Sequence, residues 1–173
     1  VAEQRIHQLG HDDHPALRLE GLHQGNLPHR LGRLIGRDHD LDTIVDALTT
    51  YPVVTLVGPG GIGKTRLALA AAERAAPEGD AWLVELAEVD SPDQVARAVA
   101  DTLEVAERPG TSLIQTIVDS LQRRRVLLVL DNCEHVVEGA AQVAEALARG
   151  CEHARVVATS RERLAVNNER IVT

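Results

Sequence analysis

The sequence contains very few aromatic residues. Its 173 residues include no Phe and no Met, one Trp and one Tyr, which leaves little for nucleic-acid bases to stack on. The formal net charge is −8, and an acidic chain repels a polyanion. We therefore expect no direct contact between this chain and nucleic acid.

Cysteines and long apolar runs are also scarce. Cys133 and Cys151 have neither the spacing of a zinc site nor that of a thioredoxin motif, and we expect two small buried thiols in a reducing compartment. No apolar run approaches membrane-spanning length and no signal peptide is visible, so we expect a cytoplasmic protein without a membrane partner. Because the chain begins at Val1 and its last residues look like the middle of a strand, we also expect a piece of a longer protein.

One stretch, residues 58–65, matches the phosphate-loop pattern G-x-x-x-x-G-K-[ST] at every fixed position. Glycines let backbone N–H groups approach phosphate oxygens, and the N-terminus of the following helix adds its partial positive charge. In this pattern the lysine serves the β- and γ-phosphates and the threonine holds Mg²⁺, and Lys64 is the only lysine in the chain. The alternative is a glycine turn before a helix that binds nothing. The residues predicted to bind the nucleotide here are Gly58, Pro59, Gly60, Gly61, Ile62, Gly63, Lys64, Thr65 and Arg66.

Short apolar runs alternate with helical patterns around this loop. Strands are predicted at 53–57, 81–86, 126–130 and 155–159, and helices between 36 and 52, at 66–74, after 92, after 112 and at 136–149. This order, together with the phosphate loop, predicts an α/β P-loop NTPase that resembles the ASCE and AAA-like type, with a doubly wound, mainly parallel sheet and helices on both faces. Ligands bind such a sheet where the carboxyl ends of its strands meet. Gly58, Asp131 and Arg161 are predicted to lie at that edge.

Two acidic residues follow the predicted strand at 126–130. Asp131, at its end, has the position of a Walker B aspartate and is predicted to hold Mg²⁺ together with Thr65; the alternative is a buried helix N-cap. Asn132 stands where many related ATPases have a glutamate, so we expect slow hydrolysis. Glu134 is either the base of that reaction or an acid favoured by the first turn of the next helix.

Arg161 follows the next predicted strand. It is predicted to contact the γ-phosphate; the alternative is an exposed arginine that pairs with Glu162 or Glu169. The predicted catalytic residues are Lys64, Asp131, Glu134 and Arg161.

Residues 1–34 lack a hydrophobic period and are predicted to be a linker, followed by the nucleotide-binding domain at 35–173. Residues 11–14, His-Asp-Asp-His, look like metal ligands, but neighbouring residues on an irregular segment seldom converge on one ion. The three arginines at 123–125 are expected to be a solvated helix end rather than a phosphate or DNA contact.

The chain resembles the NB-ARC-type nucleotide domain of STAND ATPases (signal-transduction ATPases with numerous domains) in three segments: GPGGIGKTRLA at 58–68, LLVLDNCEH at 127–135 and TSRERL at 159–164. The similarity is strongest to large bacterial regulators that end in a LuxR-type DNA-binding helix-turn-helix. Asn26-Leu27-Pro28 and Ile35-Gly36-Arg37 resemble that family's entry segment, which implies that Arg37 lies near the base or ribose; the alternative is a salt bridge at a helix start. Leu34-Ile35 stand where the family often has Tyr or Phe before the Gly-Arg pair.

The resemblance also implies a domain organisation. The helical lid and the winged helix of the family would lie beyond Thr173, and the first 25 residues resemble the connector that follows a nucleotide cyclase domain in some members. DNA would then be contacted only through a domain outside this chain, and ATP-dependent oligomerisation of the full-length parent is a further option.

We accordingly expect an ATP/ADP-binding switch module of a multidomain bacterial signalling or transcriptional regulator, with weak Mg-dependent ATP hydrolysis. A small-molecule kinase is a first alternative, which would need an acceptor pocket and a catalytic residue near the loop. An AAA-type motor is a second, which would need a ring and an arginine finger supplied in trans. A module that holds nucleotide only as a structural element is a third.

Overall fold

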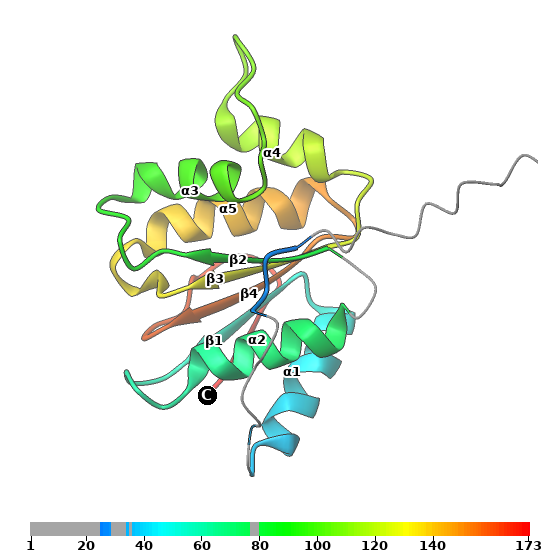
Figure 1. Cartoon of the computed structure of the whole chain (residues 1–173), viewed down its shortest axis with the longest axis vertical. Coiled ribbons are helices and arrows are strands. Elements are labelled where there is room, and N and C mark those ends of the chain that lie inside the picture. The colour runs from blue at the N-terminus through cyan, green and yellow to red at the C-terminus, as the bar shows by residue number, and fades with distance from the viewer. Residues whose placement is uncertain (1–24, 29–33, 35, 77–79) are drawn as a thin grey trace, which may run out of the picture.

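Within the residues that the structure describes, five parallel strands form one sheet at the centre of the molecule (Figure 1). The structure is a computed structural model that describes residues 25–28, 34, 36–76 and 80–173. The strand order is β2-β3-β4-β1-β5, and the four pairings between neighbours are all parallel. The strands are β1 (Val53–Val57), β2 (Asp80–Glu85), β3 (Val126–Asp131), β4 (Arg155–Ser160) and β5 (Glu169–Val172).

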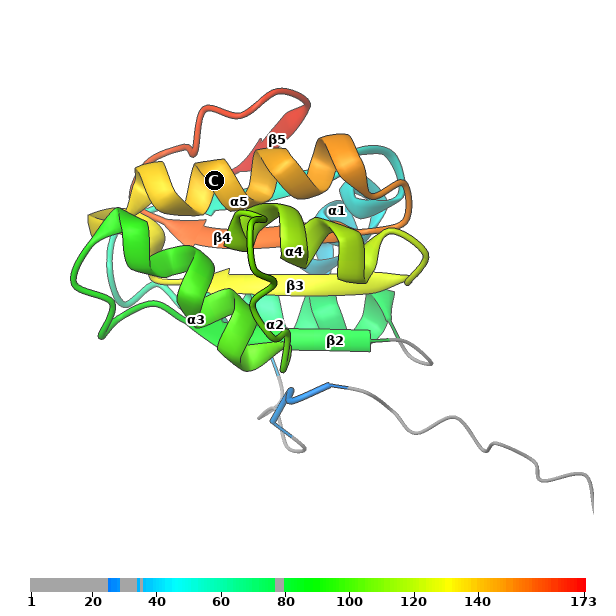
Figure 2. The same ribbon diagram turned by 90° about the horizontal axis from the view of Figure 1, so that it is seen from above.

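Helices cover both faces of this sheet, as predicted (Figures 1 and 2). Among the described residues, two α-helices lie on one face and three on the other, and two short 3-10 turns, η1 and η2, precede α3 and α5. The helical elements are α1 (Asp38–Thr50), α2 (Lys64–Ala75), η1 (Pro92–Gln94), α3 (Val95–Thr102), α4 (Leu113–Leu121), η2 (Cys133–His135) and α5 (Val137–Gly150).

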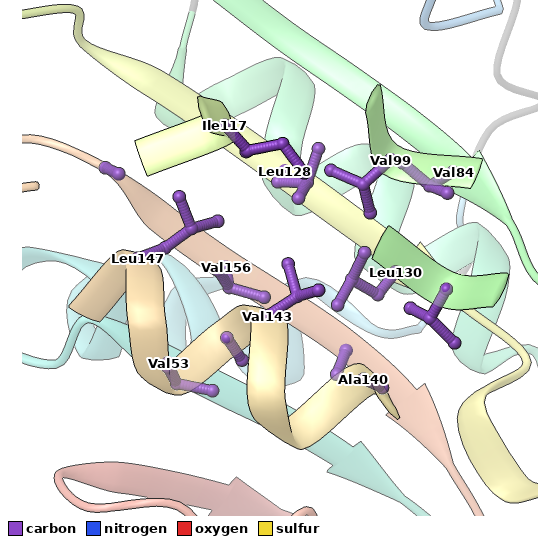
Figure 3. Close-up of a cluster of buried hydrophobic side chains, with 14 of the residues drawn as sticks. Val53, Val84, Val99, Ile117, Leu128, Leu130, Ala140, Val143, Leu147 and Val156 are labelled. Atoms are coloured by element: carbon purple, nitrogen blue, oxygen red, sulfur yellow. The ribbon is translucent and has the colours of Figure 1, made fainter. Parts of the chain in front are cut away.

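The two faces of the sheet carry separate hydrophobic cores. Leu128 and Leu130 of β3 pack with α3, α4 and α5 in the core drawn in Figure 3, whereas Val129 of the same strand packs against α1 and α2. Successive side chains of a strand point to opposite faces, so a strand covered on both sides must be apolar throughout. The uninterrupted apolar run at 126–130 is therefore a central strand, as its sequence predicted.

Several local predictions need correction. Helix α2 begins at Lys64, two residues earlier than predicted, because the left-handed backbone of Gly63 (φ 87°) turns the chain directly into the helix. The helix predicted after 92 starts as the 3-10 turn η1, and the side chain of Ser91 before it makes no capping hydrogen bond within the described residues. The helix predicted after 112 begins at Leu113, and Ser112 caps it, because the Ser112 Oγ accepts a hydrogen bond from the backbone N–H of Gln115 at 3.2 Å.

The arginines at 123–125 do not all form a solvated helix end. Arg124 pairs with Asp80 through an Nη2–Oδ2 contact of 2.7 Å, and both side chains are more than half buried. The parallel register places Asp80 of β2 beside Val126 of β3, so the chain between α4 and β3 must pass next to this carboxylate. This ion pair depends on strand pairing, which local sequence does not reveal.

Residues far apart in sequence meet at the free edge of β2. The Asn26 side chain accepts from the backbone N–H of Leu83 at 2.6 Å and donates to the Leu83 carbonyl at 2.9 Å, while Asn26 N donates to Ala81 O at 3.2 Å. Gly25 bridges to Ala81, and a Cβ at Gly25 would lie 2.3 Å from the Ala81 carbonyl oxygen. A short extended segment thus pairs with this edge strand, and only glycine permits the close approach at residue 25.

Several sequence predictions concern residues outside the described ranges, among them most of the linker predicted at 1–34 and all but residue 25 of the connector that the first 25 residues resemble. The His-Asp-Asp-His stretch at 11–14 lies outside the described residues, as does Ile35. Across the described ranges, none of the helices combines the length and the apolar character that crossing a bilayer requires.

Candidate functional site

The carboxyl ends of β1, β3 and β4 bring the predicted site residues to one edge of the sheet. Residues 58–63 connect β1 to α2, and the N–H of Gly58 donates to the Ser160 carbonyl at the end of β4, at 3.3 Å. Gly61 and Gly63 have φ angles of 80° and 87°, which residues with a Cβ seldom adopt. The loop therefore has the left-handed turns that an anion-binding backbone cradle requires.

The side chain of Lys64 is hydrogen-bonded to the phosphate loop. Its ammonium donates to the carbonyl oxygens of Gly58 and Pro59 at 2.8 and 3.0 Å. The ammonium and the partial positive charge of the α2 N-terminus therefore both lie at this loop.

Asp131 lies beside Thr65, 66 positions away in the sequence. The Thr65 hydroxyl donates to Asp131 Oδ1 at 2.8 Å, and the Asp131 side chain is buried at the end of β3. The alternative that Asp131 caps a helix is wrong: the residue before η2 is Asn132, and α5 begins only at Val137. The hydroxyl and the carboxylate predicted to hold Mg²⁺ are thus in direct contact.

Thr159 is a site residue that sequence reasoning missed. Its buried hydroxyl donates to Asp131 Oδ1 at 2.5 Å and accepts from the backbone N–H of Asn132 at 3.0 Å. Asn132 has a left-handed backbone (φ 63°), and the hydroxyl of Thr159 satisfies the amide of this strained residue. A polar residue near the end of β4 was visible in the sequence, but its contact with Asp131 follows from β4 lying next to β3.

Arg161 and Glu134 form an ion pair, with Nε of the arginine 3.3 Å from Glu134 Oε1. Both alternative partners predicted for Arg161 are wrong. Glu162 is not its partner, and the carboxylate of Glu169 accepts instead from the backbone N–H groups of Leu164 and Ala165, each at 2.9 Å. Glu134 lies in η2 and not in the helix that follows, so its prediction as a first-turn acid holds only for the 3-10 turn.

Arg37 contacts the loop and also makes a salt bridge at a helix start. Its Nη1 pairs with Asp40 Oδ2 at 3.1 Å, and its Nη2 donates to the carbonyl of Ile62 at 3.0 Å. The same arginine lines a hollow of about 450 Å³ beside the phosphate loop. The lining residues are Leu34, Arg37, Gly61, Ile62, Gly63, Arg66 and Leu67.

Cys133 and Cys151 are both free and buried, which confirms one part of their prediction. Burial, together with the nearby negative charges of Asp131 and Glu134, raises the pKa of Cys133 from 9.0 to about 12. A thiol with this pKa stays protonated at neutral pH, so Cys133 is a packing residue beside the site and not a nucleophile.

The residues present fit Mg²⁺ bound together with a nucleotide. No group of three or more His, Cys, Asp or Glu side chains suited to an ion occurs in the described part of the chain. Mg²⁺ bound with phosphates needs only one or two protein oxygens, because waters and phosphate oxygens complete its coordination. The contact between Thr65 and Asp131 meets that need at the foot of the loop.

Three features together define a P-loop NTPase fold. They are a glycine loop between a buried strand and a helix, a lysine and a threonine at the start of that helix, and an aspartate on a non-adjacent parallel strand. Residues 48–160 match the family described as AAA domain, and the chain belongs to that family.

Curated relatives share this sequence over much of the chain. The uncharacterized protein Mb0918 of Mycobacterium bovis is 34% identical over 148 residues, which are 84% of this chain and 38% of the relative. Rv0890c of Mycobacterium tuberculosis, named as a candidate HTH-type transcriptional regulator, is 35% identical over 68% of this chain and 13% of its own length. The chain therefore spans well under half the length of these relatives.

Solved structures share the fold at low sequence identity. The Cdc6p protein of Pyrobaculum aerophilum superposes with a TM-score of 0.58 at 16% identity, over 84% of this chain and 46% of that protein. A STAND protein with a tetratricopeptide repeat sensor from Pyrococcus horikoshii gives a TM-score of 0.52 at 19% identity, over 80% of this chain and 22% of that protein. Both likenesses concern the fold alone.

Proposed function

We propose that this chain is the ATP/ADP-binding switch module of a larger bacterial signalling or transcriptional regulator of the NB-ARC and STAND type. The observation that carries the proposal is the 2.8 Å contact between Thr65 and Asp131 at the foot of the phosphate loop. This contact brings together two residues that the sequence predicted separately to be Mg²⁺ ligands. The regulatory part of the proposal is supported by the relative named as a candidate HTH-type regulator.

Each part of the nucleotide has a place in this proposal. The N–H groups of the loop and the ammonium of Lys64 bind the phosphates, and Thr65 and Asp131 hold Mg²⁺, which neutralises phosphate charge. Arg37 and the hollow beside Gly61 accept the base or ribose, because the hollow adjoins the loop and is lined by both apolar and cationic side chains. DNA contacts and ATP-dependent oligomerisation belong to other parts of a cytoplasmic parent protein.

Hydrolysis by this site is proposed to be slow. Asn132 cannot accept a proton at neutral pH, and Glu134, the first carboxylate after Asp131 along the chain, is paired with Arg161. A carboxylate already bound to a guanidinium is less available to water, so a turnover well below the ~10 s⁻¹ of a typical enzyme is expected. Such a rate suits a timed switch between ATP and ADP states, and the role of Glu134 as the base stays a prediction.

The test is calorimetry of Mg-ATP and Mg-ADP binding to the chain and to Lys64→Ala. Charge-assisted contacts with phosphate are worth about 1.5–3 kcal/mol each, so the variant is expected to lose about tenfold or more in ATP affinity. Lys64 is only partly buried and bonds to its own loop, so the fold is expected to persist.

Arg74→Ala is the matched control for this test. It removes one positive charge from the same helix. Arg74 lies away from the loop, and its Nη1 is 2.7 Å from Asp42 Oδ1. We expect unchanged nucleotide affinity. Equal affinities of the original chain and Lys64→Ala would refute the assignment of the phosphate site.

A further inference from the structure

The Arg161–Glu134 pair lies against the phosphate loop. Nε of Arg161 contacts Glu134 Oε1 at 3.3 Å, while the other end of the guanidinium, Nη2, lies so close to the loop that a Cβ on Gly60 would be 3.6 Å from it. One edge of the guanidinium is therefore held by a carboxylate, and its Nη2 faces the loop.

The two side chains differ in how firmly they are held. The Arg161 side chain is 68% exposed, whereas that of Glu134 is 23% exposed and belongs to the short turn η2, which follows β3 directly and contacts β4. An exposed arginine has many rotamers, and ordering it on a ligand costs free energy. Glu134 removes part of that cost in advance, because it holds the guanidinium from the less mobile side.

The other carboxylate oxygen of Glu134 indicates that the pair does not serve stability. Glu134 Oε2 is buried and has no hydrogen-bond partner among the described residues. A buried acceptor without a partner destabilises the folded state, and an ion pair with a mostly exposed arginine contributes little in return. A role at the ligand site explains why a carboxylate is held in this position.

We propose that Glu134 is a positioning residue that aims Arg161 at the phosphate loop and thereby sets how strongly the site prefers ATP over ADP. The inference rests on the proposed nucleotide function. Arg161 keeps its Nε contact with Glu134 and donates from its terminal nitrogens to the phosphate that ATP has and ADP lacks. ADP gains nothing from the pair, so Glu134 acts on the difference between the two affinities.

The experiment is a double-mutant cycle on the full chain, with Mg²⁺ and either ADP or the non-hydrolysable analogue AMPPNP as the titrated ligand. Glu134→Gln is expected to weaken AMPPNP binding about two- to tenfold, the cost of ordering one long side chain, and to change ADP binding by less than about twofold. In the background of Arg161→Gln, adding Glu134→Gln is expected to cause no further loss of AMPPNP affinity.

Two controls separate positioning from charge and from folding. Glu162→Gln makes the same change of charge on an exposed neighbour of Arg161 and is expected to leave the ratio of the two affinities unchanged. Urea denaturation of Glu134→Gln is expected to show little change in stability, because the ion pair that it removes involves a mostly exposed arginine.

The outcomes are distinguishable. A gain of AMPPNP affinity in Glu134→Gln that disappears without Arg161 would show that carboxylate and phosphate compete for the guanidinium, and would overturn the positioning role. Equal losses with and without Arg161 would overturn it as well. If the original chain binds neither nucleotide, the proposed function itself fails; if it binds both and depends on Lys64, only the inference about Glu134 is at stake.

Discussion

The buried hydroxyl of Thr159 allows a quantitative test of how the site is assembled. Thr159→Val keeps the shape of the side chain but removes the bonds to Asp131 Oδ1 (2.5 Å) and from Asn132 N–H (3.0 Å). A hydrogen bond to a charged group contributes about 1.5–3 kcal/mol, and a buried N–H without a partner costs about 1–3 kcal/mol. Because the two hydrogen bonds share one hydroxyl, their contributions to stability are not simply additive. We therefore expect the free energy of unfolding to fall by about 2–4 kcal/mol.

Urea denaturation followed by the fluorescence of Trp82, the only tryptophan, measures this loss. Small domains are stable by only about 5–15 kcal/mol, so the shift is large against the total. Thr159→Ser is the matched variant: it keeps the hydroxyl and loses one buried methyl group, at a cost of about 1 kcal/mol. If the valine variant loses less than about 1 kcal/mol, or is more stable than the serine variant, the hydroxyl does not hold Asp131 and Asn132 together.

Two further predictions concern the sheet edge and the thiols. Asn26→Ala removes the two side-chain hydrogen bonds to Leu83 and uncovers the β2 edge. We therefore expect the free energy of unfolding, measured in urea, to fall by about 1–2 kcal/mol, and the protein to self-associate more in sizing experiments. An unchanged elution volume and an unchanged urea midpoint would contradict this. The thiol of Cys133 has a pKa of about 12 in the folded protein and of about 9.0 in the unfolded chain. Above pH 9 the unfolded state therefore binds fewer protons than the folded state, and the free energy of unfolding falls as the pH rises. By pH 10 the loss is about 1.4 kcal/mol relative to pH 7, and Cys133→Ala should show a smaller drop over the same interval.

The sequence was a good guide to whatever depends on local pattern. The phosphate loop at 58–65 needs glycines at fixed spacing, and the buried strand at 126–130 needs an apolar side chain on both faces, so both are visible in one short window. The placement of Asp131 at the ligand edge follows from parallel strands that alternate with helices. These parts of the fold and site were predicted with nearly the observed bounds.

Contacts between segments were not predictable in the same way. The pairing of Arg161 with Glu134, and not with Glu162 or Glu169, depends on β4 lying next to β3. The same neighbourhood brings Thr159 to Asp131. Sequence periodicity indicates that a residue lies at the end of a strand, but not which strand is its neighbour. The partners of site residues therefore required the three-dimensional arrangement.

The single lysine has a practical consequence for chemical labelling. Lys64 carries the only side-chain amine, and that amine is hydrogen-bonded to the carbonyls of Gly58 and Pro59 inside the phosphate loop. Apart from the α-amino group, every amine-directed reagent therefore reports on this one position. Coupling the protein to a surface through lysine would block the loop itself, whereas the rate of acylation of Lys64, followed by mass spectrometry, measures occupancy of the loop at a single atom.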